Sequence, residues 1–94
     1  MQLTNFLQLI NDLDPETRFY FKLAGHTYPL AKFTLSRQEC LAVTGNRALT
    51  RQQMGPLLAN LHHKNTPLRV QANQKSAAVY GLQFNLQAHT ATLC

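Results

Sequence analysis

Residues 36–61 read SRQECLAVTGNRALTRQQMGPLLANL and contain two helix-start signals. The first is the S-x-x-E pattern that begins at Ser36, in which the serine oxygen and the glutamate each satisfy an unpaired backbone donor. It predicts a helix through residues 40–43 that ends at Gly45, because glycine most readily takes the left-handed conformation that follows a helix. The second is the T-x-x-Q pattern that begins at Thr50. The stretch therefore predicts a helix, a turn and another helix.

The second helix is expected to bury one apolar stripe. The stripe follows the spacing i, i+3, i+4, i+7 and consists of Met54, Leu57, Leu58 and Leu61. Pro56 lies past the first turn, where it removes a ladder hydrogen bond. The helix is therefore expected either to kink there or to begin its regular part at this proline. It should end by residues 65–67, since a proline restricts the residue before it to extended backbone.

The residues before this stretch predict one helix and one β-hairpin. Thr4 can cap a helix with a one-sided apolar stripe. The stripe consists of Phe6, Leu7, Ile10 and Leu13. Residues 18–23 are aromatic and bracketed by basic residues, which favours a strand, and residues 28–35 can pair back onto it. Pro29 cannot donate a ladder bond, so the second strand is expected to be an edge at its start or to begin after the proline.

The residues after the stretch predict a second hairpin. Residues 68–71 alternate apolar and polar side chains, and an extended pattern resumes at residues 77–82 after a polar tip. Residues 83–87 alternate strictly, so they extend the second strand or form another.

The aromatic side chains of the first hairpin have two candidate roles. Alternation places Phe19 and Phe21 on one face of their strand and Tyr20 on the other, which favours core positions for the two phenylalanines. Together with Tyr28 and Phe33, the group could instead stack unpaired bases on a sheet.

Positive charge is concentrated in the second part of the chain. Up to residue 39, four basic and four acidic residues cancel, whereas residues 40–94 hold five basic residues and no acidic one. The formal charge of +5 therefore belongs to residues 40–94. This asymmetry indicates a polyanionic partner, either nucleic acid or an acidic protein surface. The alternative is chance in a small chain with few acids.

From Lys32 to Leu82, the expected order of short strand, helix, turn, helix and hairpin resembles a winged helix-turn-helix domain. The resemblance implies an α+β fold in which residues 1–94 form one small domain and residues 32–82 its winged-helix-like part. The expected order of elements is an N-terminal helix, a β-hairpin, a helix-turn-helix-like pair and a β-wing.

In winged-helix domains, the second helix of the pair enters the major groove of DNA with its first turn closest to the bases. The resemblance therefore implies that Arg51 reads guanine and Gln52 reads adenine. The first turn offers Thr50, Arg51, Gln52 and Gln53, and the expected phosphate contacts are Arg47, Lys64, Arg69 and Lys75. The alternative is that the first-turn side chains are ordinary helix-surface residues.

Catalytic and metal-binding patterns are missing from the sequence. It has no glycine-rich phosphate loop, HExxH motif or nucleophile elbow, so we expect no enzyme and no cofactor. His62 and His63 are adjacent and would point about 100° apart on a helix, so no metal site is expected. Cys40 and Cys94 are expected to be free thiols.

Residues 1–13 lack the basic start of a secretory signal, and no apolar run approaches the ~18 residues of a membrane span. A cytoplasmic protein with no membrane contact is expected.

These features lead to two functional hypotheses. The first is a small cytosolic DNA-binding protein, a transcriptional regulator or accessory factor acting as a homodimer on duplex DNA. The second is a non-catalytic protein-binding inhibitor or adaptor, of the kind carried by phages and other bacterial mobile elements. Low charge, abundant Gln and Asn and exposed strand edges are compatible with the second hypothesis. A winged-helix shape whose helix face serves dimerisation is a further alternative.

Overall fold

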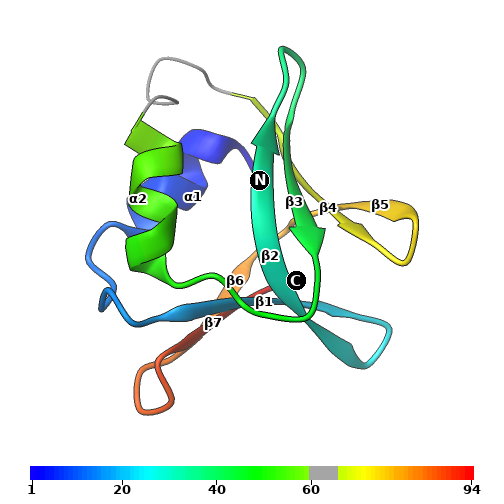
Figure 1. The fold of residues 1–94 in the computed structure, drawn as a ribbon. Helices are drawn as coiled ribbons and strands as arrows, with labels where there is room; N and C mark the ends of the chain where they lie inside the picture. Colours follow the sequence, from blue (N-terminus) through cyan, green and yellow to red (C-terminus); the bar gives the residue numbers. More distant parts are fainter. Residues whose placement is uncertain (60–65) are drawn as a thin grey trace.

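Strands dominate the structure. The computed structural model describes residues 1–59 and 66–94, and within them the chain forms a seven-stranded mixed sheet and two short helices (Figure 1). The elements are α1 (Leu3–Ile10), β1 (Arg18–Leu23), β2 (His26–Leu35), β3 (Cys40–Thr44), α2 (Arg51–Ala59), β4 (Leu68–Ala72), β5 (Lys75–Ala78), β6 (Leu82–Asn85) and β7 (Thr90–Leu93). The expected winged helix-turn-helix fold is wrong, because the segment expected to form the first helix of the pair is strand β3.

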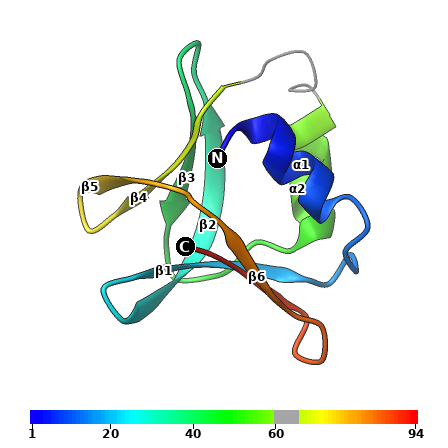
Figure 2. The same ribbon diagram turned by 180° about the vertical axis from the view of Figure 1, so that it is seen from behind.

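The strand order in the sheet is β5-β4-β3-β2-β1-β7-β6. Strands β1, β2 and β3 form an antiparallel meander, and α2 then crosses over to the parallel strand β4. The start of β2 pairs with β1, and its remainder pairs with β3, so β2 belongs to both halves of the sheet. Residues 79–81 link β5 directly to β6, and Figure 2 shows the sheet curling into a barrel-like shape. Both helices lie together on one side of the strands (Figures 1 and 2).

Helix α1 joins the two halves of the sheet through its buried face. The ring of Phe6 lies 6.0 Å from the ring of Phe19 on β1, edge to face, and stacks 5.8 Å from Phe33 on β2. Aromatic pairs of this kind contribute about 0.5–1.5 kcal/mol beyond their burial. Phe19 and Phe21 are fully buried, so their expected core positions are confirmed and they offer no surface on which bases could stack.

The turn at Ser36 explains why a helix-start signal precedes a strand. The Ser36 hydroxyl accepts hydrogen bonds from the backbone N–H groups of Gln38 and Glu39, at 3.3 and 3.1 Å, as it would at a helix start. The Ser36 N–H also donates to the Glu39 carbonyl at 2.9 Å, which reverses the chain and joins β2 to β3. Burial then alternates along β3, with Cys40 and Ala42 inside. The same local hydrogen bonds therefore begin a hairpin here.

Gly45 follows β3, so its expected role as the end of a helix is wrong. A Cβ atom at position 45 would lie 2.6 Å from the Cβ atom of Ala31. Ala31 lies where the pairing of β2 with β3 shifts register, between Leu30 and Lys32. Close approach to this bulge, and not a left-handed conformation, therefore explains the glycine.

Several other sequence predictions are confirmed. The capping box at Thr50 does begin a helix, α2, which runs through Pro56 as one element and buries Met54. Strand β1 has the predicted bounds, and it pairs with β2 as a hairpin. The second hairpin also forms, from β4 and β5. The predicted cap of α1 at Thr4 is wrong, because the helix begins at Leu3 with Gln2 as its cap, two residues earlier than expected.

Candidate anion-binding groove

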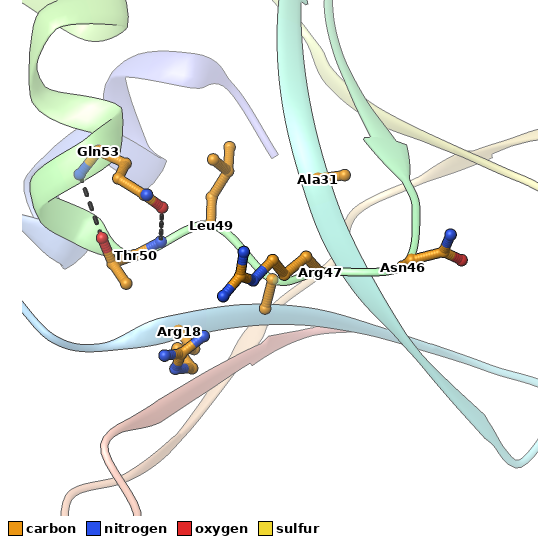
Figure 3. A pocket seen from close by; sticks show the side chains of 8 residues that line it. Arg18, Ala31, Asn46, Arg47, Leu49, Thr50 and Gln53 are labelled. Carbon is orange, nitrogen blue, oxygen red and sulfur yellow. Dashed lines mark hydrogen bonds between the residues drawn. The ribbon is translucent and has the colours of Figure 1, made fainter.

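The loop between β3 and α2 forms one wall of an open groove. Backbone hydrogen bonds hold the loop at both ends. The Gly45 N–H donates to the Pro29 carbonyl at 3.0 Å, the Leu49 N–H donates to the Leu30 carbonyl at 2.8 Å, and the Phe19 N–H donates to the Leu49 carbonyl at 3.1 Å. The loop is therefore tied to both β1 and β2. The groove has a volume of about 440 Å³ (Figure 3). Its lining consists of Arg18, Ala31, Asn46, Arg47, Ala48, Leu49, Thr50 and Gln53.

Two arginine side chains supply the charge of this groove. Arg18 comes from the start of β1 and Arg47 from the loop, and both are exposed. Figure 3 shows both guanidinium groups beside the capping residues of α2. Among the described residues, neither guanidinium has a carboxylate within ion-pair distance or another hydrogen-bond partner. Two unpaired cations therefore share one hollow.

The backbone at the start of α2 is not available to a ligand. The Arg51 N–H donates to the Thr17 carbonyl at 2.8 Å, and the Gln52 N–H donates to the Pro15 carbonyl at 3.0 Å. The Gln53 N–H donates to the Thr50 hydroxyl at 3.2 Å. In return, the Gln53 side-chain oxygen accepts the Thr50 N–H at 3.0 Å. An anion in the groove would therefore be held by side chains, with the helix dipole as a secondary contribution.

Arg51, an expected base reader, points to α1. Its Nε donates to the Ile10 carbonyl at 2.9 Å, and its Nη2 donates to the Asn11 carbonyl at 2.8 Å. These carbonyls are at the C-terminal end of α1, where no helical N–H can reach them. The Arg51 side chain, from the first turn of α2, therefore caps the C-terminal end of α1. Gln52, the other expected reader, is exposed on α2.

Two other expected phosphate contacts, Arg69 and Lys75, are not among the residues that line the groove. Arg69, on β4, places its Nε 2.9 Å from the Ser76 hydroxyl and 3.8 Å from a Glu39 carboxylate oxygen. Lys75 is exposed at the start of β5. Lys64 lies outside the described residues. The structure therefore does not bring the described phosphate candidates together, since Arg47 lines the groove while Arg69 and Lys75 belong to the β4–β5 hairpin.

The structure brings Arg47, Thr50 and Gln53 together and adds Arg18, which the sequence analysis did not select. The only signal for Arg18 was its place at the basic start of an aromatic strand. Strand β1 neighbours the loop before α2 through the isolated bridge of residues 18 and 50 and the hydrogen bond from the Phe19 N–H to the Leu49 carbonyl. This pairing between distant segments leaves no local pattern in the sequence.

A second hollow, of about 490 Å³, shares Arg18 and Thr50 with the groove. Its other lining residues are Glu16, Ala88 and His89. The groove and this hollow therefore meet at Arg18.

The cysteines and histidines that the structure describes form neither a disulfide nor a group of metal ligands. Cys40 and Cys94 are free thiols. Burial raises the pKa of the Cys40 thiol to about 11, and the nearby Glu39 carboxylate adds to the rise, which makes it a poor nucleophile. Among residues 1–59 and 66–94, no three His, Cys, Asp or Glu side chains are grouped as metal ligands would be. His62 and His63 lie outside these residues.

Comparison of the chain with protein-family models, with curated proteins and with solved structures found no match. Within the described part of the chain, no helix is both long enough and apolar enough to cross a membrane.

Proposed function

We propose that this protein is a non-catalytic nucleic-acid-binding protein that holds the phosphate backbone of duplex DNA in the Arg18–Arg47 groove. The observation that carries the proposal is the pair of unpaired guanidinium groups lining one hollow of about 440 Å³. A planar guanidinium can donate two parallel hydrogen bonds to a phosphate, and release of counterions from DNA favours such contacts. The net charge of +5 would further attract a polyanion.

Such contacts position DNA without reading its sequence. Because Arg51 is engaged in capping α1, base recognition by this side chain is not part of the proposal. We therefore propose an accessory role with weak sequence preference, in place of site-specific regulation. A cytoplasmic setting is proposed as well, and the two free thiols are compatible with it.

Binding to a duplex oligonucleotide should be measured against salt concentration for the whole chain and for Arg18→Ala and Arg47→Ala. Each variant removes one phosphate contact, so each should lower the slope of log affinity against log salt by about 0.9. Arg37→Ala is the matched control, because Arg37 is an exposed arginine in the β2–β3 turn, away from the groove. Arg37→Ala removes one positive charge, as each groove variant does, but it should leave the slope of log affinity against log salt unchanged. An Arg37 variant as impaired as the groove variants, or no binding at any salt concentration, would contradict the proposal.

A second candidate function, binding of a protein partner, is favoured by a different surface. Tyr80, Phe84 and Leu86 are 87%, 42% and 75% exposed, which is unusual for large apolar side chains close together in sequence. The partner would be another protein or a second copy of this chain. Phe84→Ser together with Leu86→Ser should abolish a stoichiometric complex that survives nuclease treatment. Because this variant keeps the net charge, it should leave DNA binding unchanged. If nuclease treatment of the natural protein is enough to break up the complex, binding of a protein partner would be excluded.

A further inference from the structure

The groove continues past Arg18 to the turn between β6 and β7. The second hollow is lined by Glu16, Arg18, Thr50, Ala88 and His89. A backbone hydrogen bond fixes this neighbourhood, because the Arg18 N–H donates to the His89 carbonyl at 2.9 Å. An extended phosphodiester held at Arg47 and Arg18 would therefore run on towards the His89 imidazole.

The backbone of His89 is unusual for a side chain of this size. Its φ is +55°, in the left-handed region that glycine adopts without cost. Asn and Asp also tolerate this region and are common in turns. A histidine kept in such a conformation beside a basic groove is a candidate functional residue, because local strain often accompanies function.

The charge of the second hollow depends on His89. Among the residues that line the second hollow, Arg18 and Glu16 cancel while the imidazole is neutral. Asp12 and Asp14 line an adjoining hollow together with His89, so three carboxylates and one guanidinium surround the imidazole. Protonation adds one positive charge. The carboxylate that faces His89 most closely is that of Asp14, whose Oδ2 lies 3.9 Å from Nδ1. The other oxygen of Asp14 accepts the Glu16 N–H at 2.8 Å, which holds this carboxylate in place.

We propose that His89 is a third, protonation-dependent phosphate contact, and that the ligand of the groove is an extended phosphodiester backbone and not an isolated phosphate. The inference rests on the proposed function. Arg47 and Arg18 hold the backbone at any physiological pH, because guanidinium groups do not lose their protons. Protonated His89 supplies the positive charge with which the second hollow accepts the next phosphate, against the carboxylates of Asp12, Asp14 and Glu16. Binding should therefore tighten as the pH falls.

The test measures binding of the whole chain to a duplex oligonucleotide at pH 8 and at pH 5.5, over a range of salt concentrations. The natural chain should bind roughly two- to fivefold more tightly at pH 5.5, with a salt slope steeper by about 0.9. His89→Asn keeps a residue suited to left-handed backbone and removes the titrating group, so it should lose both changes while matching the natural chain at pH 8. His26→Asn is the control, because His26 is exposed at the start of β2, and it should keep both changes.

Unchanged binding between the two pH values, or an equal gain in the His89→Asn variant, would overturn the inference and leave the Arg18–Arg47 groove standing. Absence of binding at both pH values would overturn the proposed function itself. Titration with inorganic phosphate separates the two ligand classes, since a single phosphate should bind with no dependence on His89.

Discussion

Arg47 and Arg51 lie close together in the sequence, yet their surroundings assign them different roles. Arg47 is exposed and lines the groove, whereas the Arg51 guanidinium donates to the carbonyls of Ile10 and Asn11 at the end of α1. The sequence could not separate them, because the acceptors of Arg51 lie about forty positions away. At the residue scale, loss of the Arg51 side chain should lower stability, whereas loss of the Arg47 side chain should weaken DNA binding.

Arg51→Ala should lower the free energy of unfolding by roughly 1–2 kcal/mol, since two charged hydrogen bonds are lost. The Asn11 carbonyl loses its partner, whereas the Ile10 carbonyl keeps the hydrogen bond from the Leu13 N–H. Arg47→Ala should change it by less than about 0.5 kcal/mol, as exposed surface substitutions usually do. Urea unfolding of both variants measures the contrast. Equal stability of the two variants would show that the capping contact contributes nothing.

Cys40 predicts a second effect, this time on pH dependence. Burial raises the pKa of its thiol from 9.0 to about 11, so between these values the unfolded chain has lost this proton and the folded chain retains it. The contribution of Cys40 to stability is therefore present below pH 9 and is lost as the pH rises towards 11. Unfolding free energies measured from pH 8 to 11 should fall more steeply in the natural chain than in Cys40→Ala. If the unfolding free energy depends on pH equally in the natural chain and in Cys40→Ala, the raised pKa of the Cys40 thiol would be contradicted.

At the element scale, two similar capping patterns had different outcomes. The pattern at Thr50 begins α2, and the one at Ser36 turns the chain from β2 into β3. Both hydroxyls make the same local hydrogen bond, so the motif alone does not determine the element. The decisive difference is that Cys40 to Thr44 lie between β2 and β4, where burial alternates with a period of two. Tertiary pairing of this kind overrides local propensity. The β1–β2 and β4–β5 hairpins were predictable, because their turns and alternation are local.

The β4–β5 hairpin carries a strain that one substitution should relieve. Its two turn residues, Asn73 and Gln74, have φ values of +50° and +65°. Gln74→Gly should raise the free energy of unfolding by about 0.5–1 kcal/mol, because an Asn-Gly pair suits such a turn best. Gly25→Ala is the converse control in the β1–β2 turn, where φ is +81° and a Cβ atom meets no neighbour. It should destabilise the chain through backbone conformation alone, and thermal unfolding measures both. A Gln74→Gly variant no more stable than the natural chain would show that the turn carries no strain.

At the scale of the whole molecule, charge composition indicated a polyanion partner but not the place where it would bind. The sequence placed the excess charge in residues 40–94, and yet Arg18, one of the two groove arginines, lies in the neutral first part. Arg69, from the basic part, is instead close to Glu39. Only the fold decides which cations are paired and which remain available, so a net charge cannot locate a site.

The most direct test of the account is nuclear magnetic resonance of the whole chain, with backbone amides and arginine Nε–H groups observed, titrated with a short duplex DNA. The account predicts that the largest shift changes occur at Arg18, Arg47 and Thr50, and that they diminish with added salt. Changes confined to Arg69 and Lys75 on the β4–β5 hairpin, or none at all, would contradict it.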